Sequence, residues 1–192
     1  KIICKQKATA RFISRHMYSF FVADEAPVPE WPYKEPNNPE AIEQHSKVYF
    51  ESGYNIKEML RFLFKSDFFK SEEVWNKRVK SPVELVVGTL RLTKEFNRPD
   101  REQYFTSLNT QYMGQWLMSP PSVEGWHWGV EWLDSGTLVE RVNFSSSNLG
   151  DQKNSGVVNL IENIKSSLNF PLESEQLVDK SLEQLGALKT SN

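Results

Sequence analysis

Residues 81–96, SPVELVVGTLRLTKEF, carry the clearest secondary-structure signal in this 192-residue chain. Ser81 is suited to cap a helix, Pro82 suits its first position, and Glu84 completes a capping box. The helix is apolar nearly all round at its start, which predicts a central, buried element. Gly88 inside it costs about 1 kcal/mol of helix stability relative to alanine, and we expect close packing against a neighbour to compensate.

Helical periodicity continues on both sides of this stretch. Asn38-Pro39-Glu40 is a second helix start, because an asparagine cap is followed by proline at the first helical position. Alternating strand patterns and internal repeats are absent from the sequence. We therefore predict an all-α fold, an irregular bundle of about seven or eight helices. The expected helices span about residues 8–23, 38–53, 55–69, 81–96, 100–117, 134–144, 157–168 and 173–185.

Two loops interrupt the predicted helices. Five prolines between residues 27 and 39 predict an extended connector on the surface. Residues 119–134 form a second loop, rich in Trp, Gly and Pro, which we call the Trp-rich loop. We expect residues 1–150 to form the main helical domain, and residues 151–192 to form a C-terminal helical pair packed on it. Because the chain enters a helical pattern almost from Lys1, we expect it to be a fragment of a longer protein.

Composition excludes several classes of function. The formal net charge of -2 and the pI near 6.0 argue against a nucleic-acid partner, which needs clustered Lys and Arg. A single cysteine, Cys4, excludes an intrachain disulfide framework and a thiolate zinc site. No apolar run approaches the roughly 18 residues of a membrane helix, so we predict no membrane span in this segment.

The Trp-rich loop and the residues after it hold the candidate binding residues. Three indoles lie within seven positions of this loop, although loops normally avoid large apolar groups. We expect the rings to turn inward and to fasten the loop to the helices. The alternatives are a stacking platform for a sugar or another flat ligand, and an anchor for a protein partner. The candidate ligand-binding residues are Trp126, His127, Trp128, Glu131, Trp132 and Arg141.

Catalytic residues are not identified by the sequence. His127 and Glu131 are four residues apart, but nearby glycines argue against a rigid helix and no HExxH motif is present, so we predict no metal site. Motifs for nucleotide cofactors and for a serine nucleophile are absent as well, so no cofactor is predicted. Glu124 and Glu131 are the carboxylates that a glycoside hydrolase would use, since spatial separation rather than sequence spacing defines such a pair.

Several blocks of the sequence resemble one protein family, the bacterial and archaeal domain of unknown function 1800 (DUF1800). The resemblance is to the C-terminal part of that family, and it covers most of the chain. Its blocks are ATARFI at 8–13 with YSFFV at 18–22, VKSPVELV at 79–86, MGQ at 113–115 with PPSVEGW at 120–126, EWL at 131–133 with RVNF at 141–144, and the tail around 176–186.

The resemblance implies a helical protein that is commonly about twice as long and often exported. A periplasmic or extracellular location is therefore favoured, although these residues alone leave the compartment unknown. Family members often occur beside sulfatase-like proteins, so the expected partner is such a protein or a glycan. No activity, cofactor or catalytic residue comes with the family. We predict a non-catalytic periplasmic or cell-surface binding module; the alternative is a hydrolase of surface carbohydrate, with carboxylates near the Trp-rich loop.

Overall fold

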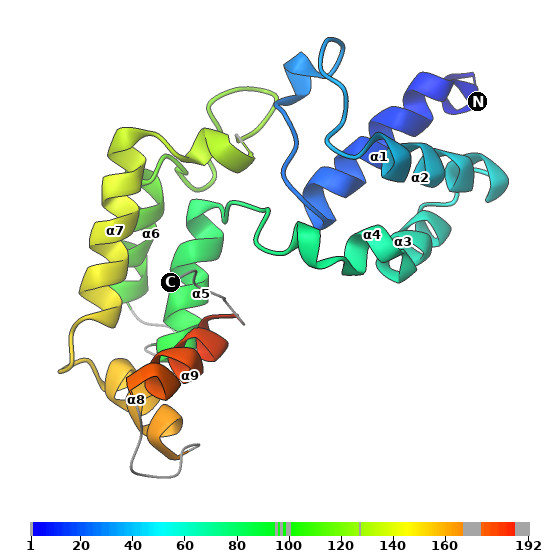
Figure 1. Cartoon of the computed structure of the whole chain (residues 1–192). Helices are drawn as coiled ribbons and strands as arrows, with labels where there is room; N and C mark the ends of the chain where they lie inside the picture. The colour runs from blue at the N-terminus through cyan, green and yellow to red at the C-terminus, as the bar shows by residue number, and fades with distance from the viewer. Residues whose placement is uncertain are drawn as a thin grey trace. The chain divides into compact units, whose positions relative to one another are not determined.

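The chain is all-α, and the predicted multi-helix fold class is confirmed (Figure 1). This architecture is that of a computed structural model, whose described part contains helices and turns but no strand. No helix in this part combines the length and the hydrophobicity that a membrane crossing requires. The described residues are 2–94, 96, 98, 101–126, 128–166 and 174–186.

The described residues contain nine α-helices and four short 3-10 helices. Two of the α-helices begin at asparagine caps: Asn38, which the sequence predicts as a cap, and Asn55, at the start of the helix expected over 55–69. The Asn38 side chain accepts a hydrogen bond from the Ala41 amide at 3.0 Å, and Asn55 accepts one from the Lys57 amide at 3.0 Å. The elements in chain order are η1 (Ile3–Lys5), α1 (Lys7–Phe21), η2 (Val28–Glu30), α2 (Pro39–Glu51), α3 (Ile56–Lys65), α4 (Asp67–Lys70), η3 (Glu72–Val74), α5 (Pro82–Thr93), α6 (Glu102–Tyr112), η4 (Gly129–Trp132), α7 (Ser135–Leu149), α8 (Ser155–Ser166) and α9 (Ser174–Gly186).

The chain divides into two compact units. The first unit comprises Lys1–Ser81 and Met118–Asp134, and the second comprises Pro82–Leu117 and Ser135–Asn192. Each unit is therefore built from two separate segments of the sequence. The division into residues 1–150 and a C-terminal helical pair was not tested by this partition and stays a prediction.

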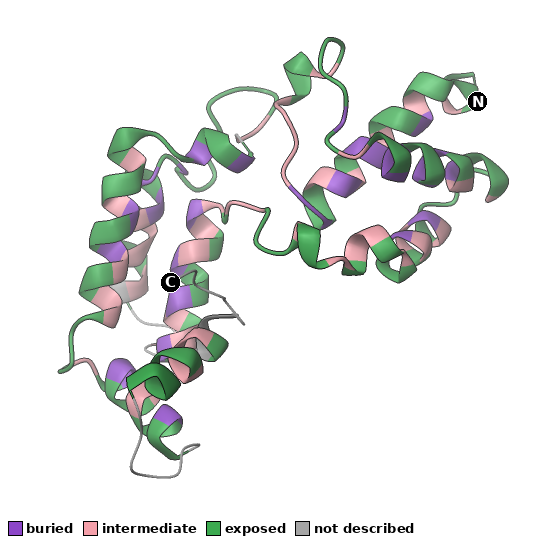
Figure 2. Cartoon of the chain, viewed as in Figure 1, coloured by how far each residue is buried: buried purple, intermediate pink, exposed green. Residues whose placement is uncertain are grey.

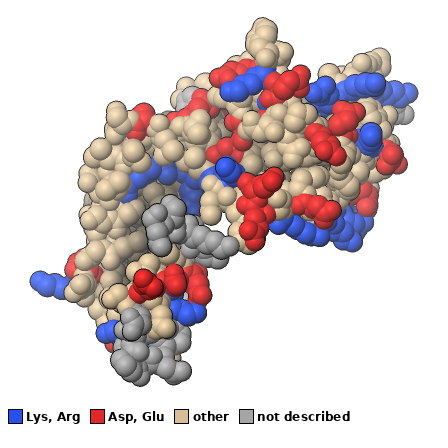
Figure 3. All heavy atoms as spheres, in the orientation of Figure 1, with Lys and Arg blue, Asp and Glu red and all other residues tan. Residues whose placement is uncertain are grey.

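The first unit is held together by α1, α2 and α3. Helix α1 packs on α2, and α2 packs on α3. Figure 2 shows buried positions along these helices, and Figure 3 shows acidic and basic side chains side by side on the face of this unit that is in view. The buried side chains that form its core come from all three helices: Ala10, Tyr18, Ala41, Ile42, Tyr49, Met59 and Leu63.

Helix α5 is central in the second unit, as its sequence predicts, but it is buried on one face only, since Val87 is 39% exposed and Gly88 and Arg91 are exposed as well. It contacts α6, α7 and α8, and Val86 forms a buried cluster with Met113 and Phe144. The expected compensation at Gly88 is wrong, however, because Gly88 is exposed and a Cβ there would meet no other described atom within 4 Å. The close approach occurs instead at Gly156, where a Cβ would overlap the carbonyl oxygen of Thr93.

Two helix ends differ from the sequence prediction. Helix α6 ends at Tyr112 rather than near residue 117, because Gly114 takes a φ of +94° that continues no helix. Several apolar residues of the expected buried face are exposed, both within α6 and after it: Phe105, Tyr112, Trp116 and Leu117. Helix α7 instead continues to Leu149, beyond its expected end near residue 144, and the Gly150 amide still donates to the Ser146 carbonyl at 2.8 Å.

Candidate ligand-binding site

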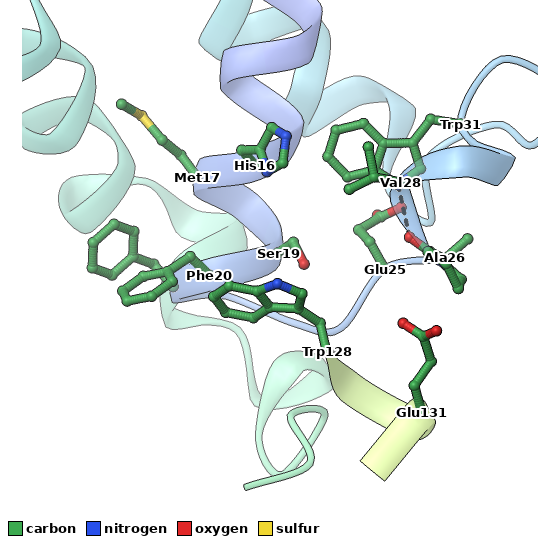
Figure 4. A pocket seen from close by; sticks show the side chains of 12 residues that line it. His16, Met17, Ser19, Phe20, Glu25, Ala26, Val28, Trp31, Trp128 and Glu131 are labelled. Carbon is green, nitrogen blue, oxygen red and sulfur yellow. Dashed lines mark hydrogen bonds between the residues drawn. The ribbon is translucent and has the colours of Figure 1, made fainter. Parts of the chain in front are cut away.

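A pocket of about 310 Å³ opens in the first unit (Figure 4). Its walls come from the last turns of α1, from the proline-rich connector between α1 and α2 (residues 22–38), and from the Trp-rich loop at the start of η4. Its volume lies at the lower end of the range for small-molecule sites, so it suits one ring-sized group. We call it the aromatic pocket; its principal lining residues are His16, Ser19, Phe20, Trp31, Trp128 and Glu131.

Aromatic rings from three segments border this hollow. The ring centroids of His16 and Trp31 are 4.6 Å apart, and those of Phe20 and Trp128 are 5.8 Å apart in an edge-to-face arrangement. The Trp31 Nε1 donates to the Ala26 carbonyl at 2.7 Å, which satisfies the indole N–H and fixes the ring. Trp128 stays 52% exposed, so part of its indole surface is accessible to a ligand.

A buried ion pair supports the connector side of the pocket. Arg15 donates from Nε and Nη2 to Glu25 Oε2 at 3.0 and 2.8 Å, and the Asn37 amide donates to the other carboxylate oxygen at 2.9 Å. The guanidinium also lies over the Trp31 ring, 4.7 Å from its centroid. Because this pair joins α1 to the connector, it holds Trp31 against α1. Further hydrogen bonds run from Arg15 to the carbonyl groups of Lys34 and Glu35.

Contact between Asp24 and Gly129 places the Trp-rich loop next to the proline-rich connector at the pocket. The Val79 amide donates to Asp24 Oδ2 at 2.7 Å, and Asn37 Nδ2 donates to the Asp24 carbonyl at 3.0 Å. Gly129 has a φ of +59° and lies so close to this side chain that a Cβ would be 2.9 Å from Asp24 Cγ. Only glycine combines this backbone conformation with this approach, so Gly129 positions the neighbouring Trp128.

His16 gives the pocket a polar group that is neutral at neutral pH. Its ring packs against Phe12, at 4.4 Å, and against Trp31, at 4.6 Å between centroids, and those two rings also contact each other at 5.5 Å. Partial desolvation in this setting lowers the pKa of His16 below its ordinary value, because the charged imidazolium loses hydration. A neutral imidazole offers one hydrogen-bond donor and one acceptor, which is useful toward a hydroxyl group.

The predicted site residues have different environments. Trp128 and Glu131 line the aromatic pocket. Trp132 is only 5% exposed, as expected for an indole that fastens the loop. Trp126 is partly buried, and its buried Nε1 has no hydrogen-bond partner within the described part of the chain.

The remaining two predicted residues, His127 and Arg141, are not among the described lining residues of the aromatic pocket. His127 lies outside the described residues. Arg141 belongs to α7 in the second unit, where burial lowers the pKa of its guanidinium. Within the described chain, no three His, Cys, Asp or Glu side chains are grouped so that they could hold a metal ion. Ligand binding by the six predicted residues stays a prediction.

Sequence reasoning missed His16, Phe20 and Trp31. The sequence predicts a helix over about residues 8–23 and an extended surface connector after it, but it predicts no binding role for either segment. One signal was present, because Phe20 and Phe21 are adjacent and successive helix positions point in different directions. A second was Trp31 within the proline-rich connector, where a large apolar ring needs a surface to pack on.

Comparison with protein families identifies the chain. The family model described as "Protein of unknown function (DUF1800)" matches residues 1–191. The chain belongs to the DUF1800 family. No curated protein and no solved structure matches it.

The blocks of sequence that carry the DUF1800 resemblance include several structural residues. Met113 and Phe144 belong to the core of the second unit. The Gln115 side chain accepts a hydrogen bond from the Val83 amide at 2.9 Å and so caps the first turn of α5 from another segment. These residues of the DUF1800 chain therefore have roles in packing and capping.

Proposed function

We propose that this DUF1800 chain is a non-catalytic binding module of the periplasm or cell surface, and that its aromatic pocket holds a sugar ring of a glycan. The observation that carries the proposal is a half-exposed indole, Trp128, beside polar side chains around one ring-sized hollow. The location follows from the family resemblance. A sulfatase-like protein partner, also suggested by that resemblance, stays a prediction.

The chemistry of the pocket matches the two surfaces of a sugar ring. A pyranose has an apolar C–H face, which stacks on an indole, and a rim of hydroxyl groups. Phe20 contacts Trp128 edge-to-face and so restrains the indole that would serve as the platform. His16, Ser19 and Glu131 also line the pocket, and their side chains offer donors and acceptors for the rim. This combination of apolar walls and few polar groups is typical of ligand sites.

The arrangement of carboxylates favours binding over glycoside hydrolysis. A glycosidase needs one carboxyl group as an acid and another as a base or nucleophile. Glu25 lines the pocket, but its carboxylate is occupied by Arg15 and the Asn37 amide. Glu124 is exposed and is not among the described lining residues. The pair considered from the sequence, Glu124 and Glu131, therefore does not face this pocket together.

Calorimetric titration with neutral, amino-substituted and acidic oligosaccharides tests the proposed function. Trp128→Ala should weaken binding about tenfold or more, which corresponds to about 1.4 kcal/mol. Trp75→Ala is the matched control, because Trp75 is 50% exposed in the same unit but does not line the pocket. The proposal is overturned if no oligosaccharide binds the folded chain, or if both variants lose the same affinity.

A further inference from the structure

We infer that the binding site extends from the aromatic pocket into a second hollow, so that its ligand is an oligosaccharide of at least two sugar rings. This inference rests on the proposed glycan-binding function and names the length of glycan that the site takes. Two adjoining hollows in the first unit carry it, and the charge of the sugar does not enter.

A second hollow of about 400 Å³ lies beside the aromatic pocket. Val28 and Trp31 line both hollows, so these two connector residues form the border between them. Figure 4 shows Val28 and Trp31 next to each other on the connector side of the aromatic pocket, away from Trp128. We call the second hollow the connector pocket; its other principal lining residues are Arg11, Phe12, Pro32, Lys34 and Glu35.

Helix α1 forms a wall of both hollows. Its residues that line the connector pocket lie within 8–15, and those that line the aromatic pocket lie within 16–21. Arg11 and Ser19, one from each set, are eight positions apart, which corresponds to about 12 Å along the helix axis. A single pyranose ring is shorter than this distance, so a sugar ligand that contacts both residues contains at least two rings.

An aromatic surface continues from one hollow to the other. His16 lines the aromatic pocket, Phe12 lines the connector pocket, and Trp31 lines both. The three rings contact one another, with centroids 4.4 Å apart for Phe12 and His16, 4.6 Å for His16 and Trp31, and 5.5 Å for Phe12 and Trp31. Phe12 is 50% exposed. Because each ring of a glycan has an apolar face, successive sugars would pack on successive parts of this surface.

The connector pocket also has polar groups that suit sugar hydroxyls. Arg11 pairs with Glu35 at 3.4 Å, and Lys34 pairs with Glu30 at 3.5 Å. All four side chains are at least half exposed, and exposed pairs of this kind contribute at most about 1 kcal/mol. A hydroxyl group both donates and accepts a hydrogen bond, so it can bind between the members of such a pair without separating opposite charges.

The closing experiment is a titration with oligomers of one to four sugars, made of glucose, N-acetylglucosamine, glucosamine or galacturonic acid. Trimers are titrated by calorimetry, and the weaker monosaccharides are measured by competition against a trimer. In each series that binds, the trimer should bind about tenfold more tightly than the monosaccharide. Arg11→Ala should weaken trimer binding about threefold or more and leave monosaccharide binding unchanged, whereas Trp128→Ala should weaken both.

Arg61→Ala is the matched control for Arg11→Ala. The Arg61 side chain is 50% exposed, against 51% for Arg11, and each arginine pairs with an exposed glutamate of the first unit. Arg61 is not among the described lining residues of either hollow. Arg61→Ala should therefore leave the affinities for monosaccharide and trimer unchanged, and both variants should keep the urea midpoint of the original chain, since surface changes have small effects on stability.

The outcomes separate this inference from the proposed function. Equal affinity for the monosaccharide and the trimer overturns the extended site but leaves glycan binding in place. A gain with length that survives Arg11→Ala also overturns the inference, because repeated presentation of one ring to the aromatic pocket would then explain it. So does an equal loss in Arg11→Ala and Arg61→Ala, or an equal loss of monosaccharide and trimer binding in Arg11→Ala. If none of the sugars tested binds the folded chain, the proposed function fails together with the inference.

Discussion

Replacing Trp132 by alanine should destabilise the protein about twice as much as replacing Trp128, although the two residues lie four positions apart. A fully buried aromatic side chain removes about 200 Å² from water, at about 25 cal/mol per Å². Trp132 is 5% exposed, which gives a loss of about 5 kcal/mol. Trp128 is 52% exposed, which gives about 2 kcal/mol. A cavity at position 132 would widen this difference.

Urea denaturation followed by far-UV circular dichroism measures this difference, provided that the m-values of the variants agree. Trp75→Ala serves as the reference for an indole of similar exposure, 50%, away from the pocket. Ligand titration of the same proteins should show the reverse order, with the larger loss in Trp128→Ala. Equal destabilisation by Trp128→Ala and Trp132→Ala would refute the assignment of one indole to the pocket and the other to the scaffold. So would a loss below about 0.5 kcal/mol in Trp132→Ala, since such values are typical of surface changes.

Three further predictions concern backbone approach and charge. Gly156→Ala should destabilise the second unit, because its Cβ would overlap the Thr93 carbonyl oxygen. Gly88→Ala, at an exposed position of α5, should instead stabilise the protein by up to about 1 kcal/mol. Similar urea midpoints for the two variants would contradict this contrast. Gly129→Ala should weaken glycan binding and cost about 1–2 kcal/mol for its positive φ, and unchanged titrations would argue against its positioning role. Burial lowers the pKa of His45 below 6.5, so between the folded and unfolded pKa values the unfolded chain binds more protons and stability falls as pH falls. The fall in urea midpoint between neutral and mildly acidic pH should be smaller in His45→Gln, and an unchanged fall would exclude His45 as its source.

The aromatic residues show where prediction from the sequence reached its limit. The expectation that the indoles fasten the Trp-rich loop describes Trp132, which is buried, but not Trp128, which borders a pocket. The periodicity of α1 likewise marks Phe20 as an apolar helix residue, yet its ring contacts Trp128 from a segment more than 100 positions away. Composition and spacing carry no information about such a pairing, because it depends on which segments meet.

The sequence by itself determined the all-α class, the asparagine-capped helix starts and membership of the DUF1800 family. Helix starts are readable because a cap and the amide that it binds are two or three residues apart, as at Asn38 and Asn55. Only the tertiary structure decided at which glycine a side chain would clash, and which indole borders the aromatic pocket. Those choices depend on close approach between distant segments, such as Gly129 and Asp24. Helix propensity reflects only neighbouring residues and so does not predict this approach, whereas in the folded protein the repulsion between overlapping atoms excludes a side chain there.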